Sequence, residues 1–167
     1  MTTPTQRNRP RRLALQALAT SLAVVAWPGP VAAQAYYQLL RDGNPPPNES
    51  SFYFTFTGPA VYTDAGKFQK IEFKDIEKRE AGDKPGHETK ADNGWVAMVQ
   101  HYFTSAWLLS DTSSREIFTR KVDKNLYAVG MIQPLGELAP GASRTLEATL
   151  YIGPQEEKKL ETLAPGL

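Results

Sequence analysis

Residues 94–107 read GWVAMVQHYFTSAW and form the most hydrophobic stretch of the chain beyond residue 35. Every side chain from Trp95 to Val99 is apolar. A strand with one wet face alternates apolar and polar residues, whereas a strand covered on both faces is apolar throughout. The stretch from Trp95 to Trp107 therefore predicts a central strand of a β-sheet.

Segments on both sides of this stretch carry the period-two signature of strands. In residues 51–57, Phe52, Phe54 and Phe56 fall on one face, and Gly58 with Pro59 is expected to end the strand because proline cannot donate to a ladder. We predict strands over residues 36–40, 51–57, 67–74, 116–122, 126–132 and 143–152, with residues 60–63 as a short strand or the arm of a turn. The fifth and fourth of these form a hairpin around residues 123–125.

Polar segments separate the predicted strands. Residues 75–93 are charged and contain Gly82, Pro85 and Gly86, which favours a solvated connecting loop over a contact with a partner, with one helical turn near Ile76. Residues 110–114 and 135–141 are further loops. The loops leave no room for long helices inside the domain.

The C-terminal residues predict one helix that opens at Gly153 and Pro154 and stops at residues 165–166. Glutamates at 156 and 157 suit its positive end, and lysines at 158 and 159 follow them. Leu160 and Leu163 provide a narrow apolar stripe, which either caps the sheet or docks elsewhere. The fold class is therefore mainly β, a partial antiparallel β-supersandwich with a C-terminal α-helix.

Composition fits a single β-rich domain. The chain has 167 residues, of which 41% are hydrophobic and 22% charged, and its 13 prolines and 12 glycines favour many turns. The net charge of +1 gives no footprint of nucleic-acid binding or of a polybasic membrane patch beyond the first dozen residues. The absence of cysteine excludes disulfides, thiol catalysis and cysteine metal sites.

Residues 1–35 differ from the domain that we expect over residues 36–167. Four arginines between positions 7 and 12 precede an apolar run over residues 13–27, and small residues near Ala33 and Ala35 suit cleavage. This is the pattern of a secretory signal, and the run is short for a membrane span. We therefore expect an export leader, which would place the rest of the chain in the periplasm.

Few side chains suggest chemistry. His87 lies in the polar loop, where we expect a solvated ring, and His101 lies in the buried stretch, where we expect a structural histidine. Phe52, Phe54 and Phe56 are expected to pack in the core rather than line a cleft. The carboxylates are interleaved with lysine and predict a solvated charged face; they are Asp64, Glu72, Asp75 and Glu77. No nucleophile, phosphate-binding or metal motif occurs, so we expect no enzyme, no catalytic, cofactor or metal residue and no cofactor.

The central stretch is also the strongest part of a family pattern. It closely resembles the strand GWVAM-x-Q-x-YF-x-x-AW in the periplasmic domain of YidC-type membrane protein insertases. Residues 51–63 resemble the family's strand leading into G-x-A-x-Y, and residues 70–73 match its K-x-x-F segment. Residues 151–155 resemble its W-x-G-P helix start, and residues 163–165 its A-P stop. The resemblance covers nearly all of residues 36–167, the C-terminal half of the large periplasmic domain.

The resemblance implies a β-supersandwich similar to sugar-mutarotase-like domains, without cofactor or covalent chemistry. The family aids insertion and folding of bacterial inner-membrane proteins, alone or with the Sec translocon. It implies contacts with Sec translocon components and nascent inner-membrane proteins, no nucleic acid, and a location at the periplasmic face of the inner membrane. Membrane association would come from segments that this sequence does not contain.

Two departures leave alternatives open. The family's insertase residues, including a groove arginine, match no position here, and residues 1–35 replace the family's membrane anchor and first half-sandwich. The chain is then a truncated or misassembled reading frame, a secreted fragment or one half of a split protein. A periplasmic mutarotase-like carbohydrate-binding protein is the alternative function, and it requires a carboxylate beside His101 in an open cleft. A non-functional fragment would instead show exposed apolar patches.

Overall fold

Two antiparallel sheets form the described part of the chain, which is residues 31–44 and 55–167 of this computed structural model. The first sheet has four strands in the order β1-β8-β7-β4. Its strands are β1 (Val31–Asp42), β4 (Lys90–Ala91), β7 (Arg115–Asp123) and β8 (Leu126–Leu138). All of its neighbouring strands run antiparallel.

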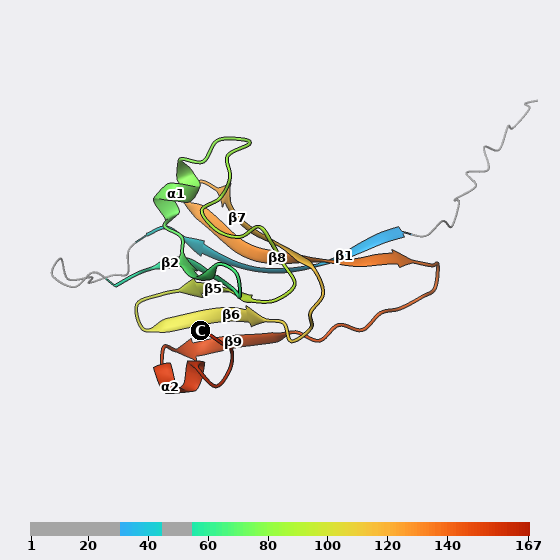
Figure 1. Ribbon diagram of the computed structural model, residues 1–167. Coiled ribbons are helices and arrows are strands. Elements are labelled where there is room, and N and C mark those ends of the chain that lie inside the picture. Colours follow the sequence, from blue (N-terminus) through green and yellow to red (C-terminus); the bar gives the residue numbers. More distant parts are fainter. Residues whose placement is uncertain (1–30, 45–54) are drawn as a thin grey trace, which may run out of the picture.

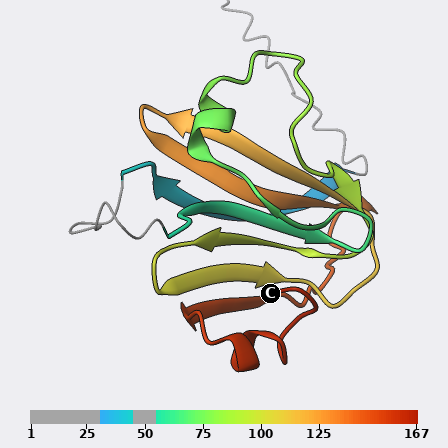
Figure 2. The same ribbon diagram turned by 60° about the vertical axis from the view of Figure 1, so that its left-hand side comes forward.

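The second sheet has five strands in the order β3-β2-β5-β6-β9, so that β5 lies at its centre. Its strands are β2 (Gly58–Thr63), β3 (Lys67–Lys70), β5 (Trp95–Val99), β6 (Phe103–Leu108) and β9 (Thr149–Pro154). In Figures 1 and 2 the sheets form two layers, with the short helices α1 (Phe73–Glu77) and α2 (Glu157–Leu160) at opposite outer sides. The predicted mainly β sandwich with a C-terminal helix is confirmed.

The core lies between the inner faces of the two sheets. Val61, Val96 and Met98 of the five-stranded sheet pack against residues of β7 and β8 such as Ile117 and Met131. All five side chains are almost completely buried. Burying side chains of this size stabilises the fold by about 1.5–3 kcal/mol each.

The inner face of the five-stranded sheet is covered over β2, β5 and the Trp107 end of β6, but not over the Phe103 end of β6 or over β9. Met98 lies opposite Ser105, and Ser105 lies opposite Ile152, so these three side chains share one face. Met98 is 1% exposed, whereas Ile152 is 71% and Phe103 58% exposed. The apolar face therefore continues beyond the strands that the four-stranded sheet covers.

The C-terminal segment covers the opposite, outer face of the five-stranded sheet. Trp95, Ala97 and Ala106 form a second buried cluster there, and Ala164 and Leu167 pack against it. Figure 1 shows α2 lying beside β9 with the C-terminus returning across the sheet. Leu160 of α2 is 7% exposed, so of the two alternatives for the apolar stripe, this residue follows the one in which the helix caps the sheet. Leu163, at 40% exposed, belongs to the surface instead.

The stretch 95–107 forms a hairpin rather than one strand. β5 is buried on both faces, as predicted, but the chain turns at residues 100–102 and returns as β6. The backbone N–H of Gln100 donates to the Phe103 carbonyl at 2.8 Å, and that of Phe103 donates to the Gln100 carbonyl at 3.2 Å. The prediction of one strand was wrong because a tight turn between apolar strands needs neither glycine nor proline.

The predicted hairpin around residues 123–125 is confirmed as β7 and β8. Asn125 has a φ of 55°, a left-handed conformation that asparagine tolerates better than other non-glycine residues. β8 continues to Leu138, however, through residues that we predicted to be a loop. A register shift lets Ala33 face Gly136 and Gln34 face Pro134, so the proline and glycine lie at a β-bulge instead of ending the strand.

β1 contains the predicted strand 36–40 and begins earlier, at Val31. Residues 31–35, which we expected to belong to the leader, pair with the end of β8. Their alternation was concealed because the sequence there is rich in alanine. β1 thus forms a twelve-residue edge of the four-stranded sheet.

β2 begins at Gly58 and Pro59, the residues expected to end the preceding strand. The Pro59 carbonyl accepts a hydrogen bond from the Ile71 N–H at 2.9 Å, and the β2–β3 ladder itself starts only at Ala60. The side of Pro59 that lacks an N–H donor is therefore directed toward β3 just before the ladder begins, so that no ladder hydrogen bond is lost. Residues 51–54 of the predicted strand lie outside the described residues, and residues 55–57 are not in a strand.

Two other strand boundaries differ from prediction. The strand expected over residues 67–74 ends at Lys70, because Ile71 turns into the core and Phe73 begins α1. The helical turn near Ile76 is confirmed. β9 begins at Thr149 rather than at residue 143, since its partner β6 ends at Leu108, opposite Thr149.

The terminal helix α2 is shorter than predicted. Pro154 ends β9 instead of opening the helix, and Glu156 is the residue that precedes the first helical turn. The backbone N–H of Gln155 donates to the Tyr102 carbonyl at 2.8 Å, which keeps the chain paired with the sheet at this point. Pairing with the sheet therefore delays the helix by three residues.

Candidate functional site

An open groove lies on the outer face of the five-stranded sheet, where β6 ends and β9 begins. We call it the outer groove; its volume is about 730 Å³. Its floor is Tyr62, Trp95 and Leu108 of the sheet. Its sides are residues 93–94 and 108–110, the connection 146–149 that leads into β9, and residues 162–165 of the C-terminal segment.

Trp95 anchors the floor of the outer groove. β2 and β5 pair so that Tyr62 lies opposite Trp95, and the two rings stack with centroids 5.7 Å apart and an angle of 11° between their planes. The indole Nε1–H donates to the Pro165 carbonyl at 2.9 Å. Stacked aromatic pairs contribute about 0.5–1.5 kcal/mol beyond their burial. Trp95 thus holds the C-terminal segment against the sheet.

Gly94 requires a backbone conformation and a space that suit only glycine. Its φ is 91°, and a Cβ atom would lie 1.9 Å from the Tyr62 carbonyl oxygen. Glycine adopts this conformation without steric penalty. The wall of the groove can therefore approach β2 closely at this point.

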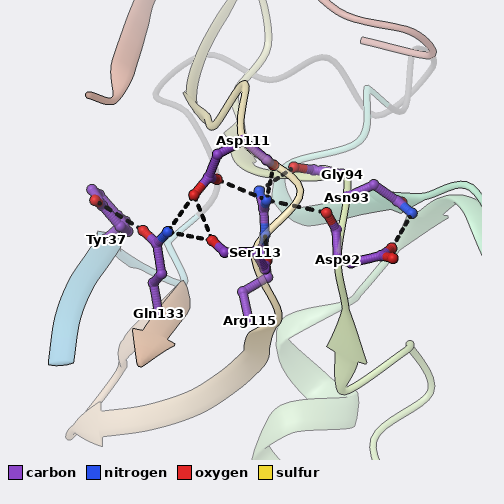
Figure 3. Close-up of polar contacts among 8 residues, drawn as sticks. All are labelled: Tyr37, Asp92, Asn93, Gly94, Asp111, Ser113, Arg115 and Gln133. Carbon is purple, nitrogen blue, oxygen red and sulfur yellow. Dashed lines mark hydrogen bonds and ion pairs between the residues drawn. The ribbon is translucent and has the colours of Figure 1, made fainter. Parts of the chain in front are cut away.

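Arg115, at the start of β7, fixes the loops that form this wall (Figure 3). Arg115 is 1% exposed, and its guanidinium donates to the Gly94 carbonyl at 3.4 Å and to the Asp92 carbonyl at 3.3 Å. It also donates to the Ser113 carbonyl at 3.2 Å and forms an ion pair with Asp111 at 3.0 Å. Burial lowers the pKa of Arg115, and the Asp111 carboxylate opposes that shift. One side chain therefore connects residues 92–94 with residues 111–113.

A chain of hydrogen bonds links this arginine to the four-stranded sheet. The Gln133 amide donates to the Asp111 carboxylate at 2.5 Å and to the Ser113 hydroxyl, and the Tyr37 hydroxyl donates to the Gln133 carbonyl oxygen at 3.4 Å. Burial raises the pKa of Tyr37, and Asp111 raises it further. The polar cluster in Figure 3 thus joins β1 and β8 to the loops beside the outer groove.

Two carboxylates, Asp64 and Glu147, lie on the rim of the outer groove, and both residues are exposed. The backbone N–H of Asp64 donates to the Asn93 side-chain oxygen at 2.8 Å, which ties the β2–β3 turn to the groove wall. No lysine, arginine or histidine lines the groove in the described residues. The rim therefore carries acidic groups over an apolar floor.

His87 is buried, contrary to the expectation of a solvated ring. It is 7% exposed, its Nδ1 lies 2.8 Å from the Glu88 carbonyl oxygen, and its Nε2 lies 3.0 Å from the Thr119 hydroxyl. Arg79 donates to the same hydroxyl at 3.1 Å. Burial lowers the pKa of His87, the hydrogen bond to the Glu88 carbonyl opposes this, and Arg79 adds to it. The polar segment that we expected to be a solvated connector is thus fastened to β7.

His101 lies in the β5–β6 turn rather than in a buried strand. Its ring contacts that of Tyr102, with centroids 3.9 Å apart. In the described part of the chain neither His87 nor His101 forms a hydrogen bond or ion pair with a carboxylate side chain. The pairing that a mutarotase-like site requires is therefore not formed among these residues.

The four carboxylates singled out from the sequence are all exposed. Glu77 accepts from Lys121 at 2.6 Å and from Tyr127 at 2.8 Å, which lowers its pKa and fastens α1 to β7 and β8. Glu72 pairs with Lys74 at 2.6 Å. These contacts join surface elements and converge on no common site.

The phenylalanines of residues 51–57 are only partly described. Phe52 and Phe54 lie outside the described residues. Phe56 lines a smaller pocket of about 270 Å³ and lies beneath the Lys70 ammonium, 5.3 Å from the ring centroid. The described residues contain no group of three or more His, Asp or Glu side chains able to hold a metal ion, and none of their helices is long and apolar enough to cross a membrane.

Neither Arg115 nor the outer groove was predicted from the sequence. The alternation of β7 contained the signal for the arginine, since Arg115 shares its face with buried Ile117 and Thr119. The groove had no local signal, because its parts come from five distant segments.

Comparison with known proteins identifies the family. The model of the YidC periplasmic domain matches residues 28–167. The chain belongs to the YidC periplasmic domain family. The match includes residues 31–35, in agreement with their place in β1.

Curated relatives carry the name membrane protein insertase YidC. The protein of Janthinobacterium sp. is 57% identical over 131 residues, which are 78% of this chain and 22% of that protein. The protein of Cupriavidus necator is 52% identical over 149 residues, or 89% of this chain and 26% of that protein. The protein of Aromatoleum aromaticum is 51% identical over 138 residues, 82% of this chain and 24% of that protein. The chain spans about a quarter of the length of these YidC relatives.

Proposed function

We propose that this chain is the docking portion of a membrane protein insertase at the periplasmic face of the bacterial inner membrane. In this role it aids the insertion and folding of inner-membrane proteins through contacts with Sec translocon components and nascent chains. It catalyses no covalent chemistry and uses no cofactor. The functional domain in this proposal is residues 36–167 together with the start of β1 at Val31.

The outer groove is the observation that carries this proposal. It combines an apolar floor, an acidic rim and a wall fastened by Arg115, features that suit a protein-binding surface. A preformed wall reduces the entropy lost on binding. The groove contains no histidine, and its two carboxylates lie on an open rim, which gives it none of the paired groups of an acid–base catalyst.

The uncovered apolar face over β9 and the Phe103 end of β6 supports the same role. Phe103, Leu150 and Ile152 are 58%, 41% and 71% exposed. Exposed apolar patches of this kind mark protein interfaces. In relatives about four times as long as this chain, further parts of the polypeptide are available to pack on this face.

Photo-crosslinking tests the proposal. The segment of the Janthinobacterium insertase that this chain matches is exchanged for the chain's own residues, and a photoreactive amino acid replaces Leu163, which lines the outer groove and is 40% exposed. Val122 is the matched control, since it is apolar and 46% exposed but lies on β7 away from the groove.

Crosslinks from position 163 to Sec translocon components or to nascent inner-membrane proteins are expected, with at most a trace from position 122. Equal yields at the two positions, or no crosslink to either class of protein, would contradict the proposal.

A further inference from the structure

We propose that the outer groove binds an extended peptide segment that adds as a strand along residues 143–148 and places a basic side chain beside Asp64 and Glu147. This inference rests on the proposed function, because it names the chemistry of the segment that the docking portion takes. It depends on three features: an unpaired backbone, an apolar floor and a rim with charge of one sign.

The unpaired backbone lies directly before β9. The sequence alternation predicts a strand from residue 143, but β6 ends at Leu108, so that pairing with β9 stops at Thr149. Within the described part of the chain, residues 143–148 form no backbone–backbone hydrogen bond. Figure 1 shows this connection leaving the end of β8 and approaching β9 from beyond the end of the five-stranded sheet. Strand-like sequence with unpaired N–H and C=O groups is a template for strand addition.

The apolar floor lies beside this backbone. Leu146 and Ala148 line the groove together with Trp95 and Leu108, while Leu163 faces them from the C-terminal segment. Alternate side chains of an added strand would point toward these residues, because successive side chains in a strand face opposite sides. The floor therefore selects apolar residues at every second position.

The acidic charge of the rim favours a basic residue in the bound segment. Asp64 and Glu147 contribute two carboxylates, and the lining contains no basic side chain. A lysine or arginine at one end of the segment would lie between acidic groups, whereas a glutamate would be repelled by both. The occupant is accordingly an extended apolar segment with a basic residue at its end.

The groove walls are built to hold their shape without the occupant. Arg115 joins the loops at 92–94 and 111–113, and the Trp95 indole holds residue 165. The entropy lost on binding then comes mainly from ordering the peptide and residues 143–148, and little of it from rearranging the groove. A second copy of this chain has no basic counterpart in the same lining, which disfavours a symmetric pairing of two grooves.

Peptide binding to the full 167-residue chain tests the proposal. The probe is a fluorescein-labelled eight-residue peptide of alternating valine and threonine with one lysine near its end. A second peptide carries glutamate in place of lysine, and a third is methylated on alternate backbone nitrogens. Fluorescence polarisation measures the affinity of each at low salt and at physiological salt.

The lysine peptide is expected to bind at least about tenfold more tightly than the glutamate peptide at low salt, with the difference decreasing as salt screens the charges. Backbone methylation should abolish binding, because it removes the donors of an added strand. The variant Glu147→Lys should reverse the preference between the two charged peptides. Glu157→Lys is the matched control, since Glu157 is an exposed glutamate on α2 outside the groove.

Several results would overturn the inference. Equal affinity for the lysine and glutamate peptides would remove the role of the rim, and full binding of the methylated peptide would remove strand addition. Sedimentation showing that the chain alone is a dimer, whose dissociation is required for peptide binding, would assign the groove to a second copy. Both exchanged glutamates are exposed, so folding of the variants is expected and is checked by circular dichroism.

The two proposals fail separately. Crosslinks from position 163 without any charge preference among the peptides would retain the docking function and refute this mode of binding. Peptide binding as described, without crosslinks in cells, would retain the groove's specificity and refute its role in the insertase.

Discussion

Replacing Arg115 with methionine is expected to destabilise the chain more than any other change of a single charged residue in its described part. Methionine fills the space of the aliphatic stem but removes the guanidinium. The side chain of Arg115 is 0% exposed, and its five hydrogen bonds reach carbonyls or carboxylate of Asp92, Gly94, Asp111 and Ser113. The substitution leaves these acceptors without their common donor.

The structure sets the size of the effect. Removing one partner of a buried ion pair costs about 3–5 kcal/mol, because the other partner stays buried and unpaired. Asp111 is 47% exposed on its side chain, so water compensates part of the loss at that carboxylate. The carbonyls of Asp92 and Gly94 lose the donor that joins them to residues 111–113. We therefore expect the free energy of unfolding to fall by about 3 kcal/mol, and by about 2 kcal/mol for Arg115→Lys, which keeps the charge but loses the fork of donors.

Urea unfolding of the full chain, followed by tryptophan fluorescence, measures this loss as a lower midpoint at unchanged slope. Arg144→Met is the control: Arg144 is exposed and donates to the Leu135 carbonyl, and its loss should change stability by less than about 0.5 kcal/mol. If Arg115→Met unfolds within about 0.5 kcal/mol of the parent chain, the polar cluster does not hold the groove wall and the reasoning is refuted.

Two further predictions concern buried residues that the sequence presented differently. The Nδ1 atom of His87 carries the proton, because it donates to the Glu88 carbonyl, and Nε2 therefore accepts from the Thr119 hydroxyl. Because burial lowers the pKa of His87 in the folded chain, the neutral ring contributes stability above pH 6.5, the ordinary value. This stability is lost as the pH falls below 6.5 and through the lowered pKa of the folded state. His87→Gln should flatten the dependence of the urea midpoint on pH between 7.5 and 5, and an unchanged dependence would exclude this histidine. Leu160→Asp should cost about 3 kcal/mol, because Leu160 is 7% exposed, whereas Leu163→Asp at 40% exposure should cost less than about 1 kcal/mol; equal costs would contradict the packing of α2.

Local patterns predicted the strands well where two faces differ in environment. The alternation in β7 and β8 and the continuous apolar run of β5 each report directly on the faces of a sheet. The boundaries were less predictable, because a strand ends where its partner ends. The alternation of residues 143–148 is as regular as that of β9, yet only β9 has a partner in β6.

Polar residues were the least predictable part. His87 lies in a segment of glycine, proline and charge, and only its approach to Thr119, 32 positions away, buries it. Arg115 is buried because carbonyls from two distant loops converge on it. A buried polar group needs hydrogen-bond partners, and the partners of these two residues include groups that the fold brings close from distant parts of the sequence.

The sequence by itself determined the fold class, the presence of a buried central strand within residues 95–107 and the family, because hydrophobic patterning and motif order are properties of the chain read in one dimension. The tertiary structure decided that 95–107 is a hairpin, that β1 begins at Val31 and that β9 begins at Thr149. It also formed the outer groove from five segments that are distant in the chain. Such a site arises from which segments the packed sheets bring together, and that selection depends on long-range contacts that no local pattern records.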